Sequence, residues 1–320
     1  ILWQLWMGLN PGGDIQGVPY MFHGMSAITE TRTERGLFAH PRADESKPEE
    51  FYALFGGTRD IGGNQCLSSE RLFRENVAYA RALYDIFDVP MVSVNPSDSY
   101  TSICQCEKCR DKADPERPYL GRLSNYVWKY VNRVAKELYK THPDRYVVGL
   151  SYNTYRLPPT NIQTFSPNLV VCITQSRMRF TTKPDYFQWN RDLRKGFRAL
   201  LPGDAPKLLM DDHYRCTRGV PTYHPRAVAA DMRSLQDICL GDFTEMRLRD
   251  ILDLNVYVTG RCWWDADLDL DALLEEYYEK FYGPAKEPMK RFVSYAEQNW
   301  PDMTQSKEKI ETVQKLIRNA

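Results

Sequence analysis

From about residue 70 onward, amphipathic segments with apolar residues at helical spacing alternate with short apolar runs rich in β-branched residues. The first pattern indicates helices, and the second indicates strands of a buried sheet. Their alternation is typical of repeated βα units around a parallel sheet. The predicted helices are 70–87, 120–139, 184–201 and 225–238, and the predicted strands are 89–95, 146–153, 169–174, 207–213 and 241–245.

The chain has 320 residues, of which 42% are hydrophobic, so it is long enough to bury one large core. We therefore predict an α/β fold, a TIM-like (β/α)8 barrel that residues 1–320 form as a single domain. Segments 2–8 and 51–55 could supply further barrel strands, and the mainly helical residues 248–320 would close the barrel as a C-terminal extension. A doubly wound open sheet is disfavoured, because no Gly-x-Gly-x-x-Gly turn follows an early strand.

The composition excludes two classes of partner. Lysine plus arginine and aspartate plus glutamate both total 42, so no net positive field attracts a nucleic acid. No apolar run reaches the roughly 18 residues of a membrane-spanning helix, so we expect no membrane span. The 20 Tyr and 7 Trp residues suit stacking on sugar rings as well as core packing.

Polar side chains interrupt the carboxyl ends of four predicted strands, where barrels of this kind hold their reacting groups. A carboxylate pair there would suit glycoside hydrolysis, in which one acid protonates the leaving oxygen and the other serves as nucleophile, base or orienting group. The competing interpretation is that single acids cap helices or pair with arginine and lysine. The strand-end residues are Asn95 with Asp98, Tyr152 with Asn153, Asp211 with Asp212 and His213, and Asp242 with Glu245.

Two histidines, His23 and His213, lie in loop or strand-end contexts and are candidates for substrate contact, although a single histidine is more often structural. No His-Glu-x-x-His, Gly-x-Ser-x-Gly or phosphate-binding loop is present. These absences argue against zincin, α/β-hydrolase and nucleotide chemistry.

Three of the eight cysteines, Cys104, Cys106 and Cys109, lie within six positions. With Cys66 as a fourth ligand they could form a tetrahedral zinc site, whose role would be structural because four thiolates leave no open position. The alternatives are a disulfide with one partner left over, or buried free thiols.

Several segments in the same order resemble the domain of unknown function 4838, whose characterised members form glycoside hydrolase family 163. The resemblance spans nearly the whole chain. No single motif is specific, but the order and spacing together are. The segments are 3–8, 48–59, 65–68, 92–98 with the three clustered cysteines, 152–159, 241–245, 263–265 and 282–285.

The resemblance implies a TIM-like barrel behind an N-terminal β-rich domain, which we expect to be missing from this chain since it also lacks an initiator Met. It implies an exported bacterial protein, whether periplasmic, at the cell surface or secreted, and a retaining endo-β-N-acetylglucosaminidase acting on N-glycans. No cofactor would be required for catalysis, and no oligomeric state is implied.

The same resemblance implies that Glu245 is the acid and base, that Asp98 or Asp242 orients the substrate, and that the substrate's own acetamide is the nucleophile. Relatives often have Asn-Asp-Gly where this chain has Ser97-Asp98-Ser99, so the sugar specificity could differ. The expected substrate-binding residues are His23, Asn95, Tyr152, Asn153, Asp212, His213 and Trp263.

Three alternatives remain open. A uronidase or exo-hexosaminidase on the same barrel would be favoured by a basic pocket that includes Arg156, Arg177 or Arg179. A catalytically silent glycan-binding barrel would lack a second carboxylate near Glu245. A cysteine-based metal or redox protein would depend on the clustered cysteines alone.

Overall fold

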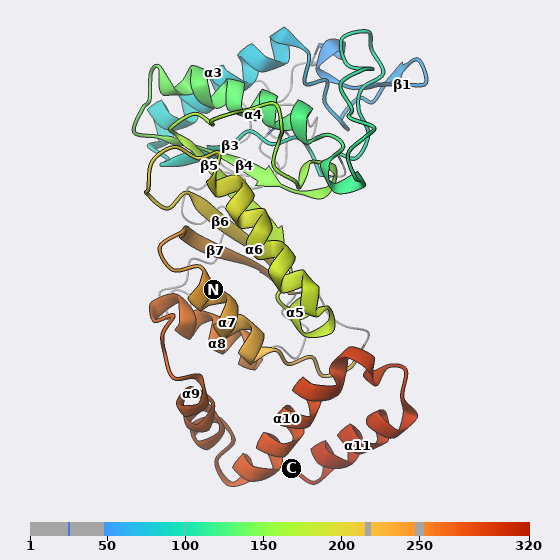
Figure 1. Cartoon of the computed structure of the whole chain (residues 1–320), viewed down its shortest axis with the longest axis vertical. Helices are drawn as coiled ribbons and strands as arrows, with labels where there is room; N and C mark the ends of the chain where they lie inside the picture. Colours follow the sequence, from blue (N-terminus) through green and yellow to red (C-terminus); the bar gives the residue numbers. More distant parts are fainter. Residues whose placement is uncertain (1–24, 26–47, 99, 215–218, 247–252) are drawn as a thin grey trace. The chain divides into compact units, whose positions relative to one another are not determined.

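The computed structural model describes residues 25, 48–98, 100–214, 219–246 and 253–320 (Figure 1). The chain divides into two compact units, which are described separately. The first unit contains residues 1–174 and 192–210, and the second contains residues 175–191 and 211–320.

The described residues form one large parallel sheet and one small antiparallel sheet. The strands of the large sheet follow one another in sequence order, as in a βα-repeat fold, and Met91 pairs with Tyr146 and Val147 with Leu169. The five strands are β3 (Met91–Ser93), β4 (Tyr146–Ser151), β5 (Leu169–Gln175), β6 (Leu208–Tyr214) and β7 (Cys239–Met246).

The prediction of a closed eight-stranded TIM-like barrel is wrong, because the sheet is a five-stranded half-barrel. Segment 51–55 does not supply a barrel strand. Gly56 and Gly57 have positive φ angles of 55° and 84°, which turn β1 (Leu54–Phe55) back onto β2 (Thr58–Arg59) as a hairpin. Segment 2–8 lies outside the described residues, and residues 253–320 contain helices and no strand.

In the first unit, α3 (Glu70–Phe87) and α4 (Ser124–Tyr139) lie side by side and contact β3 and β4 respectively (Figure 1). The predicted start of the helix 70–87 is confirmed, since the hydroxyl of Ser69 accepts a hydrogen bond from the amide of Leu72 at 3.2 Å. The short 3-10 helices of this unit are η2 (Glu49–Phe51), η3 (Tyr119–Gly121) and η4 (Asn153–Tyr155).

Helix α4 packs closely on β4 where the strand has a glycine. A Cβ atom on Gly149 would lie 2.4 Å from Cζ3 of Trp128, so only glycine leaves room for the indole ring. Trp128 is fully buried, and its Nε1 donates to the carbonyl of Tyr155 at 2.9 Å. A separate apolar cluster in this unit contains Val148, Leu150, Val170, Cys172 and Leu209.

The second unit is mainly helical. Helices α7 and α8 pack against each other, as do α10 and α11. A π-helical turn (Tyr278–Tyr282) and a 3-10 turn (Gly283–Ala285) follow α9. The helices are α5 (Met178–Thr182), α6 (Pro184–Arg198, which continues into the first unit), α7 (Pro225–Ser234), α8 (Asp253–Trp264), α9 (Leu270–Tyr277), α10 (Lys286–Met303) and α11 (Lys307–Arg318).

Among the described helices, none is long and apolar enough to cross a membrane.

The contact of Gly149 with Trp128 gives a test of this packing. We expect Gly149→Ala to lower the free energy of unfolding by about 1–3 kcal/mol, because the added methyl group overlaps the indole ring. In a Trp128→Phe background the smaller ring should relieve the overlap, so Gly149→Ala should cost much less there. Urea denaturation of the four proteins measures this coupling. An equal cost in both backgrounds would contradict the packing.

Candidate functional site

The ends of β6 and β7 hold two separate groups of acidic side chains, both in the second unit. The first group contains Asp211, His213 and Glu245. His213 Nε2 lies 2.9 Å from Asp211 Oδ2 and 3.4 Å from Glu245 Oε2. Glu245 is the solvent-facing member, because its side chain is 63% exposed whereas that of Asp211 is 5% exposed.

The second group surrounds Arg177, whose side chain is fully buried. The guanidinium Nη1 lies 3.0 Å from Asp212 Oδ2 and 2.6 Å from Asp242 Oδ2, and Nε lies 2.7 Å from Asp231 Oδ2. The backbone amide of Arg177 also donates to Asp212 Oδ1 at 2.9 Å, and Gln175 Nε2 donates to Asp231 Oδ2 at 2.9 Å. One cation therefore faces three buried carboxylates.

Strand alternation explains why the two groups are separate. Successive side chains of a β-strand point to opposite faces. Asp211 and His213 therefore share one face of β6 and Asp212 has the other, while on β7 Asp242 and Glu245 are three residues apart and also face opposite ways. The contacts follow this alternation: Asp212 and Asp242 bind Arg177, and Asp211 and Glu245 meet at His213.

Burial dominates the electrostatics of the Arg177 group. Desolvation raises the pKa of Asp212 to about 7, with the nearby Arg177 charge acting in the opposite direction. Desolvation also raises the pKa of Asp242. His224, which precedes α7, is fully buried, and burial together with the charge of Arg177 lowers its pKa to about 3. This group is thus a structural ion cluster in which Asp212 and Asp242 retain protons more readily than free aspartates do.

Trp263, at the end of α8, is anchored beside β7. Its Nε1 donates to Asp242 Oδ2 at 3.3 Å, and the residue remains 38% exposed. Trp264 follows it and is 71% exposed. Asp242 therefore holds an aromatic side chain in place, and the second unit presents two adjacent indole rings, a feature suited to contact with a sugar face.

The remaining strand-end candidates lie in the first unit. Asn95 is buried and joins β3 to β4, since its Oδ1 accepts from the amide of Leu150 at 2.7 Å and its Nδ2 donates to the carbonyl of Val148 at 3.2 Å. Tyr152 donates its hydroxyl to the exposed Asp98 Oδ1 at 3.3 Å. Asn95 therefore has a structural role, whereas Asp98 and Tyr152 form a polar pair near the surface.

Asn153 has a left-handed backbone conformation, with φ of 46°, and its Oδ1 accepts from the hydroxyl of Tyr119 at 2.8 Å. It begins the 3-10 turn after β4, a setting in which asparagine is favoured. His23 lies outside the described residues.

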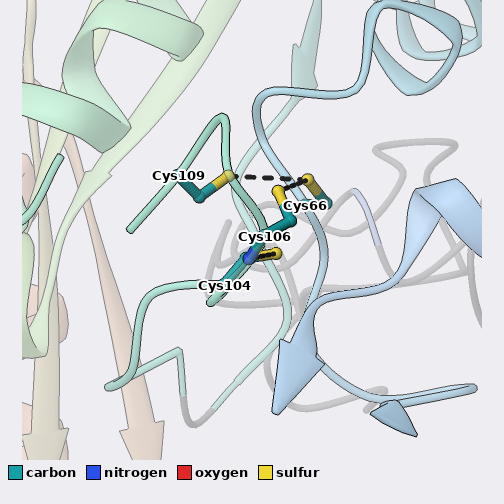
Figure 2. A group of neighbouring side chains, drawn as sticks. All are labelled: Cys66, Cys104, Cys106 and Cys109. Atoms are coloured by element: carbon teal, nitrogen blue, oxygen red, sulfur yellow. Dashed lines mark hydrogen bonds between the residues drawn. The ribbon is translucent and has the colours of Figure 1, made fainter. Parts of the chain in front are cut away.

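The predicted zinc ligands come together in the first unit (Figure 2). The Sγ atoms of Cys66, Cys104, Cys106 and Cys109 all lie within 4.8 Å of one another, and these cysteines are free thiols. Cys66, Cys104 and Cys109 are buried and Cys106 is partly exposed. The cluster has the residue types and spacing that could hold a metal ion.

The thiols of this cluster do not share one protonation behaviour. A hydrogen bond from Cys66, supported by Ser68 and Tyr126, lowers the pKa of Cys109 to about 4. The hydrogen bond to Cys109 and desolvation raise the pKa of Cys66. The hydrogen bond between Cys66 and Cys109 thus shifts the pKa values of the two thiols in opposite directions.

Two contributors to the site were not predicted from the sequence. Asp231 was missed, although it lies on the buried face of α7 with Val228 and Met232, and a carboxylate in an apolar helical stripe signals a buried partner. Arg177 was considered only as part of a basic pocket for a uronide, whereas its guanidinium is bound by carboxylates of its own chain.

Removal of the central cation should unfold the second unit more easily. We expect Arg177→Met to lower the free energy of unfolding by about 3–5 kcal/mol, because it leaves buried carboxylates without their counter-ion. Arg179→Met, at an exposed position two residues away, should change it by less than about 0.5 kcal/mol. Chemical denaturation followed by circular dichroism measures both. Equal effects of the two changes would show that the Arg177 cluster contributes nothing.

The raised pKa of Asp212 makes stability depend on pH. Between about pH 4, where an unfolded aspartate titrates, and about pH 7 the folded chain binds the proton that the unfolded chain has lost. Stability must therefore fall as the pH rises through this window, by at most about 1.4 kcal/mol per pH unit from this group. Asp212→Asn should flatten the dependence, and Glu279→Gln, at an exposed carboxylate, should not. Denaturation midpoints measured from pH 5 to pH 8 decide this, and an unchanged slope in Asp212→Asn would refute it.

Comparison with known proteins assigns the family. A family model described as a domain of unknown function (DUF4838) matches residues 14–195, more than half of the chain. The match includes the four clustered cysteines and the strands β3 to β5. No curated protein and no solved structure matches the chain significantly. The chain belongs to the DUF4838 family.

Proposed function

We propose that this chain is a glycoside hydrolase acting on glycans that contain N-acetylglucosamine, with Glu245 as its acid and base. The observation that supports this most is the meeting of two carboxylates, Asp211 and Glu245, at His213 Nε2. One of them is exposed to solvent and the other is nearly buried. Two carboxylates in contrasting environments are the usual requirement of glycosidic bond hydrolysis.

The spacing of this pair argues against an inverting reaction. Asp211 Oδ2 and Glu245 Oε2 both contact His213 Nε2, at 2.9 Å and 3.4 Å. The distance between the two oxygens therefore cannot exceed the sum of these two distances. Retaining enzymes have carboxyl groups about 5–5.5 Å apart, whereas inverting enzymes need about 6.5–9.5 Å to admit a water molecule. The pair is therefore closer than the inverting arrangement requires, and retention in this proposal comes from the acetamide nucleophile.

In the proposed first step, Glu245 gives its proton to the glycosidic oxygen as the bond from that oxygen to C1 breaks. The acetamide oxygen of the same sugar attacks C1, so that an oxazolinium ion forms, and its N–H stays hydrogen-bonded to Asp211. In the second step Glu245, now a carboxylate, takes a proton from the water that attacks C1. The bond from C1 to the acetamide oxygen breaks, which restores the acetamide group of the sugar. C1 is inverted twice, so its configuration is retained.

His213 positions this pair in the proposal, because its Nε2 contacts both carboxylates. Trp263 and Trp264 offer exposed indole rings for sugar stacking. Asp242 supports Trp263 from the opposite face of β7 and does not itself act on the sugar. The proposed steps use side chains of this chain and the acetamide of the substrate.

On the basis of the family resemblance, we also propose that the protein is an exported bacterial enzyme.

The uronide alternative has less support. It requires an arginine available to a sugar carboxylate. Arg177 is buried among three aspartates and Arg156 donates to the carbonyl of Thr174 at 2.6 Å, so of the three candidates the exposed Arg179 remains. A neutral N-acetyl sugar has no carboxylate and therefore needs no arginine to bind it.

Turnover of a released biantennary N-glycan, followed by mass, tests the proposal. We expect Glu245→Gln to reduce turnover by about 10²–10⁴-fold with glycan binding retained, because the proton donor is lost and the shape is kept. Asp211→Asn should lower kcat more than it changes KM. Glu279→Gln, an exposed glutamate in the same unit, is the matched control and should leave turnover unchanged.

Two outcomes would redirect the proposal. Glycan binding without cleavage by the unaltered chain would indicate a silent glycan-binding protein. If Asp211→Asn leaves turnover unchanged, Asp211 is not the partner of Glu245.

A further inference from the structure

The four clustered cysteines belong to the first unit and take no part in the proposed hydrolysis. They come from two segments, one that leads into α3 and one that follows β3, and their side chains converge on a common point (Figure 2). Cys104 and Cys109 have no solvent exposure and Cys66 has 4%. We propose that Cys66, Cys104, Cys106 and Cys109 bind one structural Zn²⁺ ion.

The sulfur spacing matches tetrahedral zinc. Zinc–thiolate bonds are about 2.3 Å long, so the sulfur atoms of a regular tetrahedron lie about 3.8 Å apart. Cys66 Sγ lies 3.8 Å from Cys106 Sγ and 3.6 Å from Cys109 Sγ, and all four Sγ atoms lie within 4.8 Å of one another. A disulfide would require about 2.05 Å, and it would join only two of the four sulfurs.

The surrounding donors are arranged to stabilise thiolates. The backbone amide of Leu54 donates to Cys104 Sγ at 3.2 Å, and the hydroxyl of Tyr126 lies 3.1 Å from Cys109 Sγ. Ser68 Oγ lies 3.2 Å from the same tyrosine hydroxyl and holds it in place. Outer hydrogen bonds of this kind orient metal ligands and offset the negative charge of a four-thiolate site.

The backbone between the cysteines is a compact turn. The amides of Cys109 and Arg110 both donate to the carbonyl of Cys106, at 2.9 Å and 3.0 Å, so the side chains of Cys106 and Cys109 are brought to the same side. Gln105 pairs with Leu54 through an amide-to-carbonyl hydrogen bond of 2.8 Å, which fixes the segment against β1. The ligand positions are thus fixed by backbone contacts.

The donor set selects the ion and its role. Four thiolates suit a soft or borderline cation and exclude Mg²⁺ and Ca²⁺, which require oxygen ligands. Each thiol releases its proton to solvent as it binds, and the filled tetrahedron leaves no position for a substrate or water. The ion would therefore stabilise the fold.

The zinc site would fix the segment that contains Asp98. The amide of Ser97 donates to Gln65 Oε1 at 2.9 Å, and Gln65 directly precedes Cys66. Joining Cys66 to the segment 104–109 closes a loop of about 40 residues around α3 and β3. The ion would therefore stabilise a region in which a short two-stranded hairpin buries little apolar surface.

Metal analysis of the full chain, purified without added metal, tests the proposal. We expect one zinc ion per chain by mass spectrometry, from the single four-cysteine cluster of the described residues. Replacement by Co²⁺ should give intense visible d–d bands and thiolate-to-cobalt charge transfer, the signature of a tetrahedral thiolate site.

Variants locate the ion. Cys66→Ser and Cys109→Ser should lose the bound zinc or lower its occupancy, and Cys239→Ser and Cys262→Ser, outside the cluster, should retain it. Removing zinc from the unaltered chain with a chelator should lower the midpoint of thermal unfolding by more than about 5 °C, with recovery on adding Zn²⁺. The cobalt spectrum is recorded on the unaltered chain, so it tests the site even if a cysteine variant fails to fold.

Three results would overturn the assignment. These are a chain without bound metal that also takes up no Co²⁺, a disulfide among the four cysteines revealed by thiol titration of the denatured chain, and iron in place of zinc. None of these measurements involves glycan hydrolysis, so the zinc site and the proposed function stand or fall separately.

Discussion

The buried guanidinium of Arg177 and its three carboxylates constrain the rest of the second unit. Asp212 lies on β6, Asp242 on β7 and Asp231 on α7, so one cation joins two strands and a helix. Such a cluster is costly to bury, and its value is that only one register of β6 and β7 satisfies it. That register determines which side chains appear on the opposite face.

The opposite face presents Asp211, His213 and Glu245. A shift of either strand by one residue would exchange the two faces and place Glu245 against the ion cluster. The proposed chemistry therefore depends on a structural feature that does not touch the substrate. The two groups also differ in environment, since Asp212 and Asp242 are buried with raised pKa values, whereas Glu245 reaches solvent.

The sequence predicted the strands and most helices because their periodicity is local. The prediction of a closed sheet was wrong, because closure depends on which segments return to the edge strands, and the Gly56-Gly57 turn makes one expected strand part of a hairpin. Glu245 and His213 were identified as strand-end residues, and the four cysteines were identified from spacing. Asp212 was chosen over Asp211 as a substrate contact, although alternation along β6 places Asp211 on the same side as His213. Asp231 could not be assigned to this group from the sequence, because the sequence does not show which strand α7 packs against.

The proposed hydrolysis depends on the group of Asp211, His213 and Glu245, and the location of these reacting groups is the central claim. The most direct measurement is a crystal structure of Glu245→Gln bound to an N-glycan with an intact chitobiose core. The account predicts that the amide of residue 245 contacts the scissile glycosidic oxygen and that Asp211 faces the acetamide of the sugar to be cleaved. A glycan bound with its scissile bond away from residue 245 and Asp211 would contradict it.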